Sequence, residues 1–164
     1  MGRSKPPKLR PNVAAILEKP DGRIFVAERA DIPGAWQFPQ GGVDKGESSR
    51  EALVREVEEE IGLSPDSYEI VEERSGYDYV FPNGKTKWGG CRGQTQTYFR
   101  CLFAGDDGLI DLEACDIEFA RFQWIHPREF QLAWVIEFKR EVYEKVFHDF
   151  FDVALGAKRG EHSR

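Results

Sequence analysis

Three glutamates, Glu56, Glu59 and Glu60, have a spacing that could build a cation site. Residues i, i+3 and i+4 of an α-helix are neighbours on one face, so these carboxylates would cluster and repel one another by roughly 0.2–0.5 kcal/mol per pair. A hard cation such as Mg²⁺ or Mn²⁺, which takes oxygen ligands, would relieve this repulsion. A solvated acidic face is the alternative interpretation of the same pattern.

The surrounding residues predict a loop followed by a helix that packs on a core. Gly41 opens a glycine-containing loop, and Gly62 is placed to end the helix as a left-handed C-terminal cap. Leu53, Val57 and Ile61 are four residues apart and form an apolar stripe on the helix. A helix anchored in this way beside its carboxylates favours the cation site over the solvated face.

A longer pattern over residues 41–63, here named the box, resembles the signature of the Nudix hydrolases at every fixed position. The matching residues are Gly41, Glu47, Arg55, Glu56, Val57, Glu59, Glu60, Gly62 and Leu63. The resemblance implies a divalent-metal-binding loop-helix-loop that cleaves a nucleoside diphosphate linked to another group. It also implies an α/β/α sandwich, in which a mixed β-sheet lies between helices.

The resemblance also implies roles for individual residues of the box. Glu56, Glu59 and Glu60 would bind Mg²⁺ or Mn²⁺, about two or three ions in all. Arg55 would orient a catalytic carboxylate. Glu47 would steady the loop through a charged hydrogen bond.

Composition indicates one folded domain in a chain of 164 residues, 40% of them hydrophobic and 13% aromatic. We expect a basic N-terminal arm at 1–9, the domain at 10–155 and a polar tail at 156–164. A net charge of −6 argues against a surface that coats many nucleic-acid phosphates, but leaves room for a local cationic pocket.

No stretch has the length and apolarity of a membrane span or a signal core, so we expect a cytoplasmic protein. Cys91, Cys101 and Cys115 lack the spacing of a zinc site or disulfide framework, and we expect free buried thiols.

Periodicity along the chain predicts strands that are interrupted by one helix and closed by another. The expected strands are 13–17, 23–29, 68–72, 77–81, 94–103 and 119–125, with a short extended piece at 36–40. Beyond the helix of the box, apolar residues at helical spacing predict an amphipathic helix from Glu137 onward. These elements independently favour an α/β fold with a mixed sheet between helices.

Several stretches outside the box resemble one subgroup, the bacterial RNA pyrophosphohydrolases and the related dinucleoside polyphosphate hydrolases. They are residues 10–13, 27–29, 36–42, 93–96, 118–119 and 138–143. The resemblance implies that Arg10 and Arg29 hold the 5′-terminal phosphates, which suits the paired donors of a guanidinium. It also implies that Ile136, Phe138 and Lys139 form a cleft for a base. A disordered arm, a surface strand residue and an ordinary core residue are the alternatives for Arg10, Arg29 and Phe138.

Glu118 is a further candidate carboxylate, because the matching family position lies over the metals; the alternative is a loop acid in an acidic segment. The resemblance implies metal-assisted attack of water on a 5′-triphosphate or 5′-diphosphate RNA end. Glu56 is the first choice for the general base and Glu118 the second. The product would be 5′-monophosphate RNA, the form that triggers message decay in bacteria. His126, His148 and His162 share no ligand spacing and are expected to be structural or surface residues.

Two other functions remain open on the sequence. The same site could hydrolyse diadenosine tetraphosphate or another nucleoside polyphosphate. A Nudix-fold module that binds a nucleotide without cutting it is the third hypothesis, and the intact set of box carboxylates argues against it. A homodimer is compatible with the sequence, but no pattern in it selects one.

Overall fold

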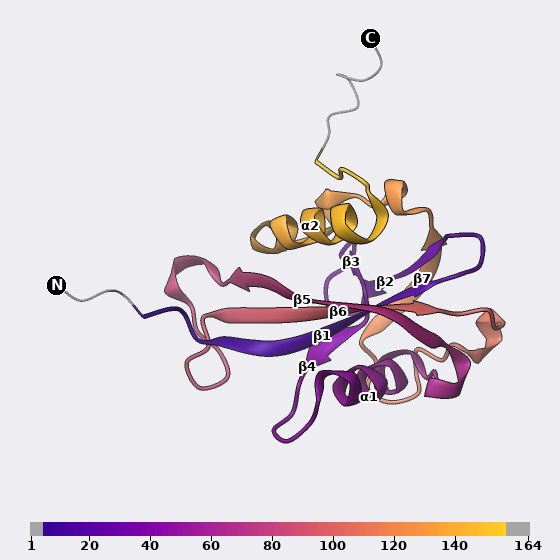
Figure 1. Cartoon of the computed structure of the whole chain (residues 1–164), viewed down its shortest axis with the longest axis horizontal. Coiled ribbons are helices and arrows are strands. Elements are labelled where there is room, and N and C mark those ends of the chain that lie inside the picture. The colour runs from indigo at the N-terminus through magenta and orange to yellow at the C-terminus, as the bar shows by residue number, and fades with distance from the viewer. Residues whose placement is uncertain (1–4, 157–164) are drawn as a thin grey trace, which may run out of the picture.

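The computed structural model describes residues 5–156, which form a mixed sheet with a helix on each face (Figure 1). The strands are β1 (Leu9–Glu18), β2 (Ile24–Arg29), β3 (Trp36–Gln37), β4 (Gln40–Gly42), β5 (Glu69–Val80), β6 (Gly93–Leu102) and β7 (Phe119–Ile125). The helices are α1 (Ser49–Ile61) and α2 (Arg140–Phe151), which lie on opposite sides of the sheet. The expected α/β/α sandwich is confirmed. His162 and most of the expected tail lie outside the described residues.

The sheet runs in the order β3-β2-β1-β6-β5, with β4 paired to β1 and β7 paired to β2. β1 and β6 are parallel over their whole length, from Leu9 beside Gly93 to Glu18 beside Leu102. The other pairs are antiparallel, so the sheet is mixed as expected. The start of β1 therefore lies next to the start of β6 and to the loop between β5 and β6 (Figure 1).

Helix α1 begins and ends at the caps that its sequence encodes. The Ser48 side chain accepts from the Glu51 backbone N–H, and the Glu51 carboxylate accepts from the Ser48 N–H, which completes a capping box. Gly62 has φ of 72° and closes the helix in the left-handed conformation, as predicted. The stripe of Leu53, Val57 and Ile61 is fully buried, and each side chain contributes roughly 1.5–3 kcal/mol through burial. This packing fixes which face of α1 carries the glutamates.

Helix α2 covers the other face of the sheet. Its Val142, Val146 and Phe147 are buried, in agreement with the apolar periodicity. Phe147 also stacks on Phe38, with ring centroids 5.9 Å apart. The α-helix begins at Arg140, later than the sequence predicted, because Glu137–Lys139 forms a 3-10 turn first.

Two further predictions from the sequence are wrong in detail. The strands expected at 68–72 and 77–81 form one continuous strand, β5, whose register with β6 shifts between Arg74 and Tyr77. Gly76, with φ of 87°, absorbs that irregularity. All three cysteines are free, but Cys115 is exposed where a buried thiol was expected, because it lies in the surface loop before β7. Over residues 5–156, no helix has the length and apolarity to cross a membrane.

Candidate active site

Arg55 and Glu47 join the loop of the box to helix α1. The Arg55 guanidinium donates through Nε to Glu47 Oε2 at 2.8 Å and through Nη2 to Glu47 Oε1 at 2.9 Å. Glu47 also accepts from the Asp44 N–H at 3.0 Å. The Arg55 hydrogen bond, with help from that N–H, lowers the pKa of Glu47 to about 2. Glu47 is therefore charged at neutral pH, and it connects the loop at Asp44 to Arg55 on α1. That it steadies the loop stays a prediction.

Arg55 also contacts the carboxylates expected to bind metal. Its Nη1 donates to Glu56 Oε1 at 2.8 Å and to Glu59 Oε2 at 3.3 Å. Burial raises the pKa of Glu56, and the Arg55 hydrogen bond opposes that shift. Gly41 lies directly against this carboxylate, since a Cβ on Gly41 would be 2.0 Å from Glu56 Cδ. The glycine that opens the box is therefore required sterically for the Glu56 carboxylate to lie against the loop.

Glu60 is buried, with only 6% of its surface exposed. Its Oε1 accepts from the Gln40 N–H at 2.8 Å. Burial, reinforced by the nearby Glu56, raises the pKa of Glu60 to about 9. A buried carboxyl that is surrounded by other acids gains a favourable partner when a cation binds beside it.

Glu56, Glu59, Glu60 and Glu118 line one cavity of about 50 Å³. Carboxylate oxygens are the donors that Mg²⁺ and Mn²⁺ prefer, so this donor set fits the divalent metal expected from the sequence. In the part of the chain that the structure describes, no three acidic, histidine or cysteine side chains are gathered closely enough to hold a metal as they stand. Arg55 also donates to Glu56 and Glu59, so a cation in this cavity would share these two carboxylates with the guanidinium.

Glu118 reaches this cavity from outside the box. It precedes β7, and its carbonyl oxygen accepts from the Ala30 N–H at 2.9 Å, which fixes the segment beside the end of β2. Its proximity contributes to the raised pKa of Glu60. The fold therefore brings Glu118 to the box carboxylates, as the sequence predicted; its role in the reaction stays a prediction. Cys115 and Asp116 line the same cavity and were not expected there.

A larger cleft of about 560 Å³ opens from these acids. Glu60 and Glu118 belong to both the small cavity and the cleft. The other side chains that give the cleft its character are Arg29, Gln40, Tyr79, Phe81, Lys85, Lys87, Trp88, Gln94, Ile136, Phe138 and Lys139. Four of the five residues predicted to hold phosphates or a base (all except Arg10) thus line a single cleft.

One wall of the cleft is cationic although the whole chain is acidic. Burial, with repulsion from Arg29 and Lys87, lowers the pKa of Lys139 to about 8. Arg29 forms a two-bond pair with Asp31, through Nε at 3.0 Å and Nη2 at 2.8 Å. Cations that repel one another in this way are stabilised by an anionic ligand placed between them.

Arg10 lies between Gly42 and Trp88, and Trp88 in turn lines the cleft. Its guanidinium carbon is 4.4 Å from the centroid of a Trp88 ring. A Cβ on Gly42 would be 2.1 Å from Arg10 Nη2, so only glycine leaves room for the guanidinium on that side. Arg10 belongs to β1 and Trp88 to the loop between β5 and β6. The interpretation of Arg10 as part of a disordered arm is therefore wrong.

Phe138 serves both the core and the wall of the cleft. Its ring centroid is 5.6 Å from that of Tyr79 and 5.9 Å from that of Phe81. Ile136 beside it is 54% exposed, and Lys139 Nζ lies 5.3 Å from the Tyr79 ring centroid. These residues form an aromatic surface beside a cation, as expected for a base-binding cleft. That they bind a base stays a prediction.

Side-chain amides under the cleft were not identified as site residues from the sequence. Asn12 donates to Gln94 Oε1 at 2.9 Å, and Gln96 donates to Asn12 Oδ1 at 2.9 Å and to Gln40 Oε1 at 2.8 Å. Gln94 in turn donates to the Tyr79 hydroxyl. The network ties β1, β5 and β6 to the start of β4, and hence to the loop that precedes α1. Buried amides are costly unless they are bonded, so the network also fixes the register of these strands.

The loop between β5 and β6 is the other part of the site that the sequence analysis missed. Lys85, Lys87 and Trp88 are exposed residues of this loop, and all three line the cleft. Two lysines next to a tryptophan could have indicated an anion-binding surface, because cations and aromatic rings together suit a nucleotide.

The family model for the NUDIX domain matches residues 8–146, which span the box, the sheet and most of α2. The chain belongs to the NUDIX domain family. An RNA pyrophosphohydrolase of Helicobacter pylori is 44% identical over 149 residues, covering 87% of this chain and 94% of the relative. Nudix hydrolase 25 of Arabidopsis thaliana is 40% identical over 157 residues, covering 88% and 87%.

Solved structures agree on the fold. The crystal structure of a binary complex of a Caenorhabditis elegans Ap4A hydrolase has a TM-score of 0.60 to this chain at 18% sequence identity. The alignment covers 88% of this chain and 98% of that one. At this identity the likeness shows the shared fold.

Proposed function

We propose that this chain is a metal-dependent RNA pyrophosphohydrolase, which converts 5′-triphosphate or 5′-diphosphate RNA ends to 5′-monophosphate and so initiates message decay. One observation carries the proposal: Glu60 and Glu118 lie at the same time in the acidic cavity and in the cleft with the cationic and aromatic wall. A polyphosphate seated there has its anhydride beside the acids and its nucleotide beside Phe138. The relatives named RNA pyrophosphohydrolase support the same substrate class.

The acidic residues of the site have two roles in the proposed reaction, metal binding and acceptance of a proton. Glu56, Glu59, Glu60 and Glu118 would hold a divalent ion, which would lower the pKa of a bound water and neutralise charge on phosphate oxygens. Glu56 is the first choice to accept the proton of the attacking water, since its carboxylate lies at the cavity beside the Gly41 backbone. The water oxygen bonds to phosphorus as the bond to the bridging oxygen breaks.

The cationic residues of the site stabilise the charge that this step develops. Arg29 and Lys139 line the cleft, and Arg10 contacts Trp88, which also lines it. Guanidinium groups bind phosphate oxygens with paired donors, so Arg10 and Arg29 would hold the phosphates that leave. Phosphate competes with Asp31 for Arg29, which makes the Arg29–Asp31 pair a resting contact of the free protein.

The direct experiment compares substrates and identifies products. The protein is incubated with 5′-triphosphate RNA and Mg²⁺, and in parallel with diadenosine tetraphosphate, with EDTA as the control for metal. We expect 5′-monophosphate RNA and released phosphates, metal dependence, and a higher kcat/KM on the RNA. A large preference for the dinucleotide would assign the same site to nucleoside polyphosphates instead. Tight nucleotide binding without turnover would identify a binding module.

A further inference from the structure

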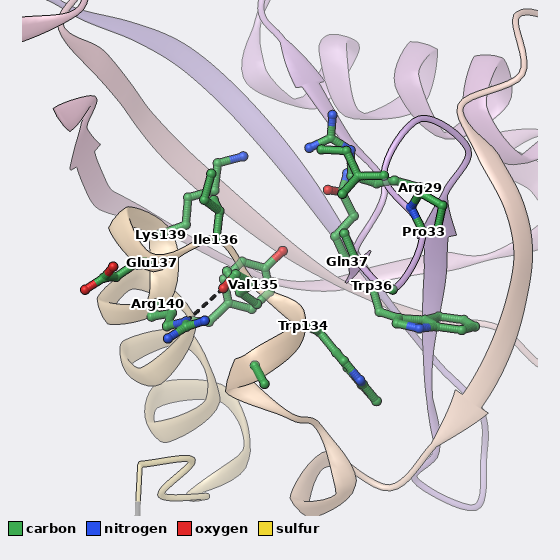
Figure 2. Close-up of a pocket in the computed structure, with 15 residues that line it drawn as sticks. Arg29, Pro33, Trp36, Gln37, Trp134, Val135, Ile136, Glu137, Lys139 and Arg140 are labelled. Carbon is green, nitrogen blue, oxygen red and sulfur yellow. Dashed lines mark hydrogen bonds between the residues drawn. The ribbon is translucent and has the colours of Figure 1, made fainter. Parts of the chain in front are cut away.

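A second cavity of about 430 Å³ adjoins the cleft, and we name it the tryptophan pocket. It lies between the segment that follows β2 and the segment that leads into α2 (Figure 2). Arg29, Ile136 and Lys139 line both the tryptophan pocket and the cleft. Figure 2 shows Arg29 and Lys139 near one end of the pocket and Trp36 and Trp134 toward the other. The two cavities therefore meet at residues that are expected to hold phosphate and base.

The far part of the tryptophan pocket is aromatic. The ring centroids of Trp36 and Trp134 are 5.9 Å apart, with an angle of 44° between the rings. Both side chains are only partly buried. Trp134 is anchored by edge-to-face packing on Phe130, with centroids 5.1 Å apart. Trp134 therefore packs on Phe130 and Trp36, and both tryptophans, only partly buried, line the pocket.

Cations border the same part of the pocket. The Arg121 guanidinium carbon lies 5.2 Å from a Trp36 ring centroid. Arg140 lines the pocket and donates through Nε to the Val135 carbonyl oxygen at 2.8 Å, a contact drawn in Figure 2. That bond fixes the turn that presents Trp134 and Ile136. Aromatic faces combined with nearby guanidinium groups are the means by which proteins bind single-stranded nucleic acid without strict sequence reading.

We propose that the tryptophan pocket receives a base of the RNA chain downstream of the nucleotides held in the cleft. The inference rests on the proposed function for the position of the 5′ end. Its volume lies within the range of small-ligand sites, which is enough for one nucleotide. A single-stranded chain that leaves the cleft past Ile136 enters this pocket, with Arg29 and Lys139 near its phosphates. The pocket makes the site favour an RNA end over a dinucleoside polyphosphate, because the second base of a dinucleoside polyphosphate lies across the phosphates and only RNA has a base on the 3′ side of the nucleotide in the cleft.

The test compares two 5′-triphosphate RNAs of the same starting sequence, about two and about five nucleotides long, on the wild type and on Trp134→Ala. Stacking of one additional base on the tryptophans strengthens binding, so we expect kcat/KM of the wild type to rise about tenfold on the longer RNA. Trp134→Ala loses this rise and keeps the activity on the shorter RNA, and Trp134→Phe restores part of it. Equal losses on both RNAs, or no length effect in the wild type, would overturn the proposal.

Two variants of Ala133 test the pocket independently, in case Trp134→Ala does not fold. Ala133 lines the pocket and is exposed, so a longer side chain there costs no packing. Ala133→Glu places a negative charge beside the RNA and lowers activity on the longer substrate more than on the shorter one, whereas Ala133→Lys does not. Equal behaviour of the two variants on the longer RNA would contradict the proposal.

Binding of 5′-monophosphate oligonucleotides of the same two lengths separates the pocket from the reaction. We expect the wild type to bind the longer oligonucleotide about tenfold more tightly than the shorter one. We expect Trp134→Ala to bind the two oligonucleotides with equal affinity. If the protein does not cleave RNA and this binding difference remains, the proposed function is wrong and the pocket assignment holds. If it cleaves RNA and the binding difference is absent, the pocket assignment is wrong.

Discussion

The Arg10 guanidinium lies over the indole of Trp88, with its carbon 4.4 Å from a ring centroid, and Gly42 closes the opposite side. Trp88 adopts φ of 49°, a left-handed conformation that is uncommon for a bulky residue. The loop between β5 and β6 thus holds Trp88 in an unfavourable backbone conformation, and in that conformation Trp88 contacts Arg10, which is expected to bind phosphate. We infer that Trp88 positions Arg10.

Replacing Trp88 tests this relationship. Cation–π contacts contribute about 0.5–2 kcal/mol, so we expect Trp88→Ala to raise KM for 5′-triphosphate RNA by about 2- to 30-fold. Trp88→Phe should recover part of the loss, because it keeps an aromatic face. Steady-state kinetics measure both. A fall in kcat with an unchanged KM would show that Trp88 acts in another way.

Gly41→Ala should inactivate the protein through Glu56. The new Cβ would be 2.0 Å from Glu56 Cδ, so the carboxylate must move away from the loop. We expect about a hundredfold loss of kcat, comparable to loss of a general base. Gly108→Ala is the matched control, since its Cβ would be 3.6 Å from the nearest atom outside its own chain neighbours, Asp106 Oδ1. Similar activity of the two variants would contradict the proposed position of Glu56.

Binding of product RNA should weaken above pH 8 because of Lys139. Its pKa is lowered to about 8 by burial and by Arg29 and Lys87, so it is charged at pH 7 and mostly neutral at pH 9. Only the charged form attracts phosphate, and the free charged fraction falls about tenfold over this range. We therefore expect Kd for 5′-monophosphate RNA, measured without metal, to rise by up to about tenfold. Lys139→Arg stays charged and should show a flat profile; an equal rise in that variant would assign the effect to another group.

Glu60→Gln should separate stability from activity. The buried Glu60 carboxyl accepts one backbone N–H, and glutamine keeps that hydrogen bond without an acid in an acidic cluster. In EDTA we expect Glu60→Gln to unfold at a higher temperature than the wild type, measured by calorimetry or circular dichroism. Its metal-dependent activity should fall. A lower melting temperature would mean that Glu60 stabilises the metal-free fold as a charged group.

Local sequence patterns predicted the elements that local forces determine. Helix α1 ends at Gly62 as expected, because this residue closes the last turn through contacts within a few residues. The strand at 119–125 has the bounds that its apolar run indicated. The division of β5 into two strands was wrong, because pairing with β6 continues across Gly76 and overrides a local break.

The parts of the site that depend on distant contacts were harder to predict. The box glutamates share one face of one helix, so their clustering follows from spacing alone. Trp88 reaches Arg10 only because β1 runs parallel to β6, and no short-range pattern encodes that pairing. The same applies to the Gln94, Gln96 and Asn12 network. Resemblance to relatives supplied Arg10, Arg29 and Phe138, whereas physical patterning alone left each of them with an ordinary structural explanation.

The central claim is that carboxylates of the box carry out metal-dependent hydrolysis of an RNA 5′ end. The most direct measurement compares Glu56→Gln with Glu58→Gln on 5′-triphosphate RNA in Mg²⁺ under single-turnover conditions. Glu58 lies on the same helix but is exposed and does not line the acidic cavity, so it is a matched control. We predict a loss of about a hundredfold or more for Glu56→Gln and wild-type rates for Glu58→Gln. Retention of the wild-type rate by Glu56→Gln would contradict the account.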